Sequence, residues 1–255
     1  MPEADNDLRR YEPHEQPALL TLSYALRRFV DTVGKIGAWM AVPLVLITVL
    51  DVLIRKMVWK DSAGHIDGVQ IWLVNNVSQY FGSTLLQELE WHFHTALFAL
   101  VLGYGYIYNT HVRVDLIREN LSFRKKIWIE FIGLTMFTLP YCVIVAYFAY
   151  IYAYDSFMIS EQSASTIGLT NRWIIKSVLV FGLVVAFSAA LAVWLQMLLV
   201  IVGDPNRRFE LMAVEWPEEA GTFIEGKRRL ELTDDEPVPA PASAPPRHAA
   251  GQPAE

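Results

Sequence analysis

The chain has 255 residues, of which 53% are hydrophobic and only 19% are charged, and its mean hydropathy is +0.28. This composition is too apolar for an ordinary soluble domain, so a membrane protein is the first expectation. The formal net charge of −6 comes from the two ends, because residues 36–202 carry ten basic and ten acidic side chains. The composition excludes a nucleic-acid binder, which needs a clustered basic excess, and a disulfide scaffold, because Cys142 is the only cysteine.

The first segment, residues 1–35, is predicted to be cytoplasmic. It is interrupted by charged side chains and has no apolar stretch of the kind found in a secretory signal peptide. The first apolar span is therefore expected to direct insertion into the membrane.

Four apolar stretches are long enough to cross a hydrocarbon core of roughly 30 Å, which takes about 20 residues of helix. Asp51 interrupts the first stretch, and the second contains His92 and His94, whereas the other two have no charged side chain. The sequence therefore predicts an all-α integral membrane protein whose four transmembrane helices form a domain over residues 36–203. The predicted spans are residues 36–54, 91–110, 131–154 and 177–203.

The stretch between the first two spans is predicted to contain interfacial amphipathic helices within residues 66–90. Val69, Leu73 and Val77 recur at helical spacing there, with polar residues between them. A fifth short span is the alternative, and it is disfavoured because Asn75 and Asn76 would lie at its centre.

Two further segments lie outside the predicted spans. The charged joint between the second and third spans, residues 109–126, predicts a short surface helix. Residues 204–255 are predicted to be a cytoplasmic tail that is acidic, rich in proline and alanine, and largely disordered.

The orientation follows from the distribution of Lys and Arg near the ends of the spans. Ten of these residues lie on the side of the two termini and of the joint at residues 109–126, and five lie on the opposite side. Because basic residues concentrate on the cytoplasmic side, both termini are predicted to be cytoplasmic.

Ionisable residues within membrane spans are the first candidates for functional residues, because burying a charge in lipid is costly, and this chain has few of them. Asp51 and Arg55 are four residues apart, a spacing that allows an ion pair on one helix face, either within the subunit or at a contact between subunits. Glu88 and Glu90 precede His92 and His94, and this group is interpreted as a polar interfacial cluster or a partner contact.

No reaction centre is predicted from these residues. A metal site would need ligands from the other spans, and a haem would need histidines on facing helices, but the first, third and fourth spans contain no histidine. No phosphate-binding loop or nucleophile, base and acid set can be assembled either, so neither an enzyme nor a bound cofactor is expected.

Three features occur in a recognisable order: Asp51-Val-Leu-Ile-Arg55, Leu86-Gln-Glu-Leu-Glu-Trp-His92 entering the second span, and His111-Val-Arg-Val-Asp115 leaving it. From about Arg28 to Val202, the chain resembles the small permease (DctQ-type) subunit of tripartite ATP-independent periplasmic (TRAP) transporters. The resemblance marks a set of motif or partner-interface residues: Asp51, Arg55, Glu88, Glu90, His111, Arg113 and Asp115.

The resemblance implies a non-catalytic subunit of the bacterial inner membrane that supports a large permease. The large permease carries the substrate and ion sites for symport of an organic acid, and a periplasmic binding protein delivers that acid. The alternative is a membrane anchor or assembly subunit of a redox complex, which haem ligation would distinguish. Membrane lipids are expected around the spans in either case.

Overall fold

The first long helical stretch begins after Pro17 and is interrupted once, close to Pro43. In the computed structural model of the chain, the described residues are 9–60, 64, 66–110, 121–165 and 168–216. Helix α1 (Ala18–Ala38) is followed, after Trp39 and Met40, by α2 (Ala41–Lys56). Pro43 lies in the first turn of α2, where its missing N–H is tolerated, but its ring would clash with the carbonyl of Trp39 in a continuous helix.

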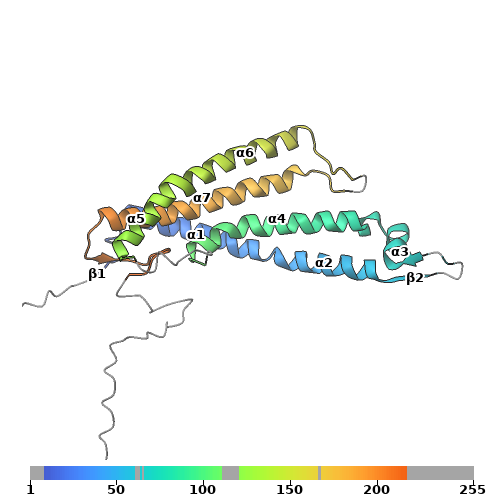
Figure 1. Cartoon of the computed structure of the whole chain (residues 1–255), viewed down its shortest axis with the longest axis horizontal. Coiled ribbons are helices and arrows are strands. Elements are labelled where there is room, and N and C mark those ends of the chain that lie inside the picture. The colour runs from blue at the N-terminus through green and yellow to red at the C-terminus, as the bar shows by residue number, and fades with distance from the viewer. Residues whose placement is uncertain (1–8, 61–63, 65, 111–120, 166–167, 217–255) are drawn as a thin grey trace, which may run out of the picture. The chain divides into compact units, whose positions relative to one another are not determined.

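A small β-hairpin follows α2. Strand β2 (Val58–Lys60) pairs with β3 (Ile66–Gly68) in antiparallel register, with Trp59 opposite Asp67. Helix α3 (Val69–Asn76) and the 3₁₀ turn η1 (Gln79–Phe81) follow the hairpin and lie with it at one end of the helical bundle (Figure 1). Within residues 66–90, where interfacial helices are predicted, Ile66–Gly68 is a strand because its backbone forms hydrogen bonds with a neighbouring strand, and helix begins at Val69. The position of these helices at the membrane interface stays a prediction.

The remaining helices are longer than the predicted spans. Helix α4 runs over Ser83–Ile107, and α7 over Trp173–Val202. Between them, α5 (Phe123–Gly133) continues through the π-helical turn η2 (Leu134–Thr138) into α6 (Leu139–Met158). The π turn ends two residues before Pro140, so the irregularity lies where the proline removes a helical hydrogen bond. Of the joint at residues 109–126, where a short surface helix is predicted, residues 111–120 lie outside the described residues, as does the tail from residue 217.

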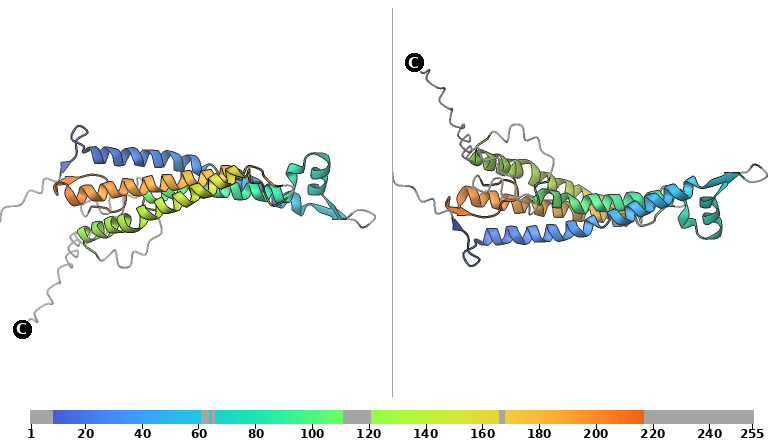
Figure 2. Two further views of the ribbon diagram at one scale, coloured as in Figure 1. Left: turned by 90° about the horizontal axis from the view of Figure 1, so that it is seen from above. Right: turned by 90° about the horizontal axis from the view of Figure 1, so that it is seen from below.

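Four helices lie side by side towards the end of the helical bundle that carries α3, which we call the α3 end. Helix α6 packs along α7, α7 along α4, and α4 along α2, so that they form one layer (Figure 1). At the opposite end, which we call the α5 end, α1 and α5 lie on opposite sides of α7 (Figure 2). Helix α7 therefore contacts α1, α4, α5 and α6.

Small residues let α4 and α7 approach closely. A Cβ atom added to Gly182 would lie 2.5 Å from the carbonyl oxygen of Ala99, and one added to Gly103 would lie 3.0 Å from that of Val185. Such contacts are typical of helices that pack in lipid, where close backbone approach replaces the hydrophobic driving force.

The core lies at the α5 end and includes the segment after α7. Met212, Ala213 and Val214 are buried together with Val193 and Met197 of α7. Strand β4 (Arg207–Arg208) pairs in parallel with β1 (Arg9–Arg10). Residues 204–215 thus fold onto the helices. The prediction of a largely disordered tail over residues 204–255 concerns mostly residues outside the described ones and stays a prediction. The chain divides into units 1–215 and 216–255, and the fold described is that of the first.

Among the described residues, three helical stretches are long and apolar enough to cross a membrane: Ala18–Lys56, Phe123–Met158 and Trp173–Val202. Helix α4 is not one of them, because Glu88, Glu90, His92 and His94 make its first half polar. The helical membrane fold is thus supported, whereas the count of four spans stays a prediction.

Candidate functional site

The Asp51–Arg55 pair predicted from its spacing is present in α2. The guanidinium of Arg55 donates to the carboxylate of Asp51, which is only 2% exposed. With its amide oxygen facing Arg55, Gln87 of α4 accepts from both terminal nitrogens, at 3.2 and 2.9 Å. The pair therefore also links α2 to the start of α4, a connection that the spacing in α2 alone did not reveal.

Glu88 fixes the loop between α6 and α7. Its carboxylate accepts a hydrogen bond from the hydroxyl of Ser163 and another, at 2.6 Å, from the backbone N–H of Leu169. Gly168 is needed there because a Cβ atom would lie 2.1 Å from that of Ser163. Glu88 and His92, which are four residues apart on α4, meet through the backbone of Glu88, since Nδ1 of His92 lies 2.6 Å from its carbonyl oxygen.

Lys176, in the first turn of α7, is held by two groups. Its ammonium forms an ion pair with Glu161 in the loop and lies 3.6 Å from the centre of the Tyr152 ring in α6. The side chain of Lys176 is only 11% exposed. The hydrogen bond from Lys176 holds the pKa of the Glu161 carboxyl below its usual range.

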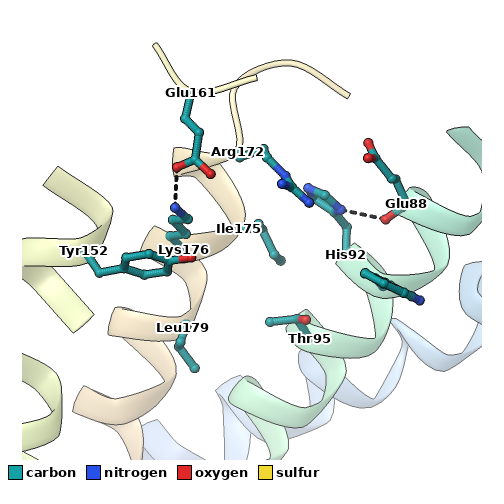
Figure 3. Close-up of a pocket in the computed structure, with 10 residues that line it drawn as sticks. Glu88, His92, Thr95, Tyr152, Glu161, Arg172, Ile175, Lys176 and Leu179 are labelled. Carbon is teal, nitrogen blue, oxygen red and sulfur yellow. Dashed lines mark hydrogen bonds and ion pairs between the residues drawn. The ribbon is translucent and has the colours of Figure 1, made fainter. Parts of the chain in front are cut away.

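These residues surround a cleft of about 250 Å³ at the α3 end of the layer (Figure 3). Helix α4 contributes Glu88, Trp91, His92 and Thr95, α6 contributes Tyr152, the loop contributes Glu161 and Arg172, and α7 contributes Ile175, Lys176 and Leu179. Sequence reasoning selected Glu88 as a site residue but not Glu161, Arg172 or Lys176. Opposite charges at both ends of a short connection were the only signal available for them.

The other predicted site residues are not brought into this cleft. The side chain of Glu90 is partly exposed and makes no hydrogen bond or ion pair with another described residue. His111, Arg113 and Asp115 lie outside the described residues.

A second polar group, at the α5 end, was not indicated by any sequence motif. Asp31 of α1 accepts from the hydroxyl of Tyr108 at 2.6 Å and from Lys35 at 2.7 Å. Arg27 donates to Glu210 at 2.6 Å and lies over the Tyr108 ring, 5.4 Å from its centre. This group joins α1 to the end of α4 and to the segment after α7.

Both polar groups connect elements of the protein to one another. Within the described part of the chain, no group of three or more His, Cys, Asp or Glu side chains could hold a metal ion. The arrangement can therefore hold helices and a loop in place, and its charged residues are mostly engaged with one another. The long apolar helices define the class of the protein, a helical membrane protein, and the polar groups described here connect its helices and loop.

The comparison with family models identifies the class more closely. Residues 68–200 match the DctQ component of tripartite ATP-independent periplasmic transporters. The match covers more than half of the chain, which therefore belongs to the DctQ family of TRAP transporter small permeases. No curated protein and no solved structure matches it.

The family resemblance predicted from the sequence is thus confirmed, over a shorter range than expected. The match begins at residue 68, within β3, and includes Glu88, Glu90 and the His111–Asp115 motif. Asp51 and Arg55 lie before it, so the family match does not extend to the first of the three motifs.

Proposed function

We propose that this chain is the non-catalytic scaffold of a TRAP transporter and supports the large permease during ion-coupled uptake of an organic acid. The observation that carries the proposal is the DctQ match over residues 68–200. In this role the large permease binds the substrate and the coupling ion, and a periplasmic binding protein delivers the acid.

The structure offers physical support for a rigid scaffold. Helices α4 and α7 are in backbone contact at Gly103 and Gly182, and polar groups join the elements at both ends. Exposed apolar side chains cover α6, including Tyr141, Phe148 and Tyr152. A firmly connected body with apolar outer faces can pack against a permease and lipid while a mobile neighbour moves past it.

We further propose the inner membrane as the location, with four spans and both termini in the cytoplasm. Helix α4 is the second span along the chain in this arrangement and brings the number of spans to four, because it packs along α1, α2 and α7. Its polar first half, with Glu88 and Glu90, then lies at the periplasmic interface. The family match does not favour the alternative, a membrane anchor of a redox complex.

Reconstitution tests the division of labour. Liposomes containing this chain alone are expected to take up neither a labelled C4-dicarboxylate nor a labelled sugar acid under a sodium gradient. Liposomes that also contain the large permease, with the binding protein outside, should take up the acid that the binding protein recognises. Uptake by this chain alone would contradict the scaffold role.

The motif at His111–Asp115 offers a test of the contact with the permease. If Arg113 and Asp115 bind the permease, Arg113→Ala and Asp115→Ala should lower co-purification and uptake together, with normal abundance of this subunit. Lys125→Ala, on the exposed surface of α5, is the matched control. Unchanged complex yield in both variants would instead favour a role for Arg113 at lipid headgroups and for Asp115 as a helix cap.

A further inference from the structure

The cleft at the α3 end combines a polar rim with apolar walls. Trp91, Ile175 and Leu179 contribute apolar surface, and the hydroxyl of Thr95 lies deeper in the same space (Figure 3). Its volume of about 250 Å³ is large enough for a small charged group and the atoms attached to it. The cleft is thus suited to a ligand with a polar head and an apolar continuation.

Three of the four charged side chains at the rim are already engaged. The two oxygens of Glu88 accept from Ser163 and from the N–H of Leu169, and Glu161 is paired with Lys176. Lys176 also lies against the Tyr152 ring. The ammonium of Lys176 is therefore already occupied and is not the main binding group for an anionic ligand.

Arg172 differs from them. Its backbone N–H donates to the backbone carbonyl of Glu161 at 3.3 Å, and its positive charge acts on the nearby carboxylates of Glu88 and Glu161. Its guanidinium nevertheless makes no hydrogen bond or ion pair with any residue that the structure describes. Figure 3 shows this side chain extending across the cleft towards the ring of His92. A guanidinium presents five N–H donors in a planar fork that matches two phosphate oxygens.

The residues around Arg172 indicate which kind of phosphate compound could reach its guanidinium. Trp91 is 69% exposed and Tyr152 is 57% exposed, and both line the cleft. Aromatic side chains of this kind collect at the level of lipid headgroups. Arg172 immediately precedes α7, one of the helices apolar enough to cross a membrane, so acyl chains below the head could follow the apolar side chains of α7 such as Leu179.

We propose that this cleft binds the phosphate of a membrane phospholipid, with Arg172 as its principal ligand. His92 and Thr95 form the opposite wall, and the acyl chains extend past Leu179. Such a lipid would supply the hydrogen-bond acceptors that the guanidinium lacks among the described residues and would fill the space between α4, α6 and α7. The inference is independent of which substrate the transporter carries.

Lipid retention by the purified full chain tests the proposal. Native mass spectrometry in a phosphate-free detergent compares dioleoylphosphatidylglycerol with a dioleoylglycerol glucoside, which has the same chains and no phosphate. The wild type should bind the phospholipid roughly tenfold more tightly, and Arg172→Gln should lose most of that difference. Lys60→Gln, which removes an exposed charge from β2 outside the cleft, should behave as the wild type.

Arg172→Lys keeps the charge without the planar fork and is expected to bind phosphatidylglycerol with intermediate affinity. It also serves as the second variant if Arg172→Gln proves poorly folded. Equal retention of the two lipids by the wild type, or unchanged phospholipid binding in both Arg172 variants, would overturn the proposal.

Two other results would assign the cleft to a different ligand and would also overturn the proposal. Displacement of the phospholipid by an equal concentration of sn-glycerol 3-phosphate would point to a free phosphate ester. Unchanged lipid retention in Arg172→Gln, together with reduced co-purification of the large permease, would point to an acidic side chain of that partner.

Discussion

At the scale of single residues, the loop between α6 and α7 is held by a pair of charged side chains at its two ends and by a carboxylate from α4. Lys176 pairs with Glu161, and Glu88 binds Ser163 and Leu169. Ser160 and Asn171 have φ values of 49° and 59°, so the chain turns through the left-handed region just after α6 and just before α7. The side-chain contacts keep this sharply turned segment against the helices.

The Glu161–Lys176 pair should make stability depend on pH. Because the folded-state pKa of Glu161 is lowered, the ionised carboxylate stabilises the folded state at neutral pH. That contribution should be lost as the pH falls through the lowered pKa. Unfolding of the full chain in detergent, measured between neutral and acidic pH, should show this loss, and Glu161→Gln should lack it.

The variant Lys176→Met checks the same pair from the other side. It keeps the apolar stem but leaves Glu161 without its cation, and should lower the free energy of unfolding at neutral pH by about 1 kcal/mol, since the pair is partly solvated. Lys125→Met, at an exposed position in α5, is the control and should change it little. Parallel pH profiles for wild type and Glu161→Gln would contradict the assignment.

At the scale of elements, two features hold the helices together: the close contact of α4 with α7, and the return of the chain after α7. In the second, the fully buried side chain of Gln196 donates to the carbonyl of Glu210 at 3.0 Å and accepts from the N–H of Met212 at 2.9 Å. The carboxamide thereby satisfies two backbone groups of an irregular segment inside the core.

Gly182 is expected to tolerate no side chain. Gly182→Ala places a methyl group 2.5 Å from the Ala99 carbonyl oxygen, so α4 and α7 must separate, at a cost of about 1–3 kcal/mol. The matched control is Gly133→Ala in α5, where an added Cβ meets no atom within 4 Å. Unfolding in detergent measures both variants, and equal stability of the two would show that the close approach is not required.

The segment after α7 is expected to behave as part of the folded unit. A chain ending at Gly203 loses the buried side chains of Met212 and Val214 and leaves Gln196 unpaired, so its unfolding midpoint should fall markedly. A chain ending at Glu215 keeps these contacts and should unfold close to the full-length midpoint. If both shortened chains unfold alike, residues 204–215 do not stabilise the helices.

At the scale of the whole molecule, the question is how the helices are oriented in the membrane. Ser122 immediately precedes α5, and Thr170 lies in the loop between α6 and α7. The ten-to-five distribution of basic residues predicts that these two exposed positions lie on opposite sides of the membrane.

Cysteine labelling of intact cells tests this orientation. In a Cys142→Ser background, Thr170→Cys should react with an impermeant thiol reagent added to the periplasm, and Ser122→Cys should react only after the membrane is opened. Reaction of Ser122→Cys from the periplasm would reverse the predicted topology.

The sequence by itself determined the membrane class, the long helices and the family. Hydropathy and helical hydrogen bonding depend on residues close together in the chain, so the apolar runs within α2, α6 and α7 could be recognised without a fold. The Asp51–Arg55 pair was equally accessible, because its partners are four residues apart on one helix.

The tertiary structure alone decided which distant residues meet. Glu88 and Ser163 are 75 positions apart, and Arg27 and Glu210 are 183 apart, so no local period relates them. The β2–β3 hairpin and the burial of Met212 likewise depend on neighbouring segments supplying hydrogen bonds and apolar surface. The cleft around Arg172 exists because α4, α6 and α7 lie side by side, an arrangement set by helix packing and loop contacts rather than by any one stretch of sequence.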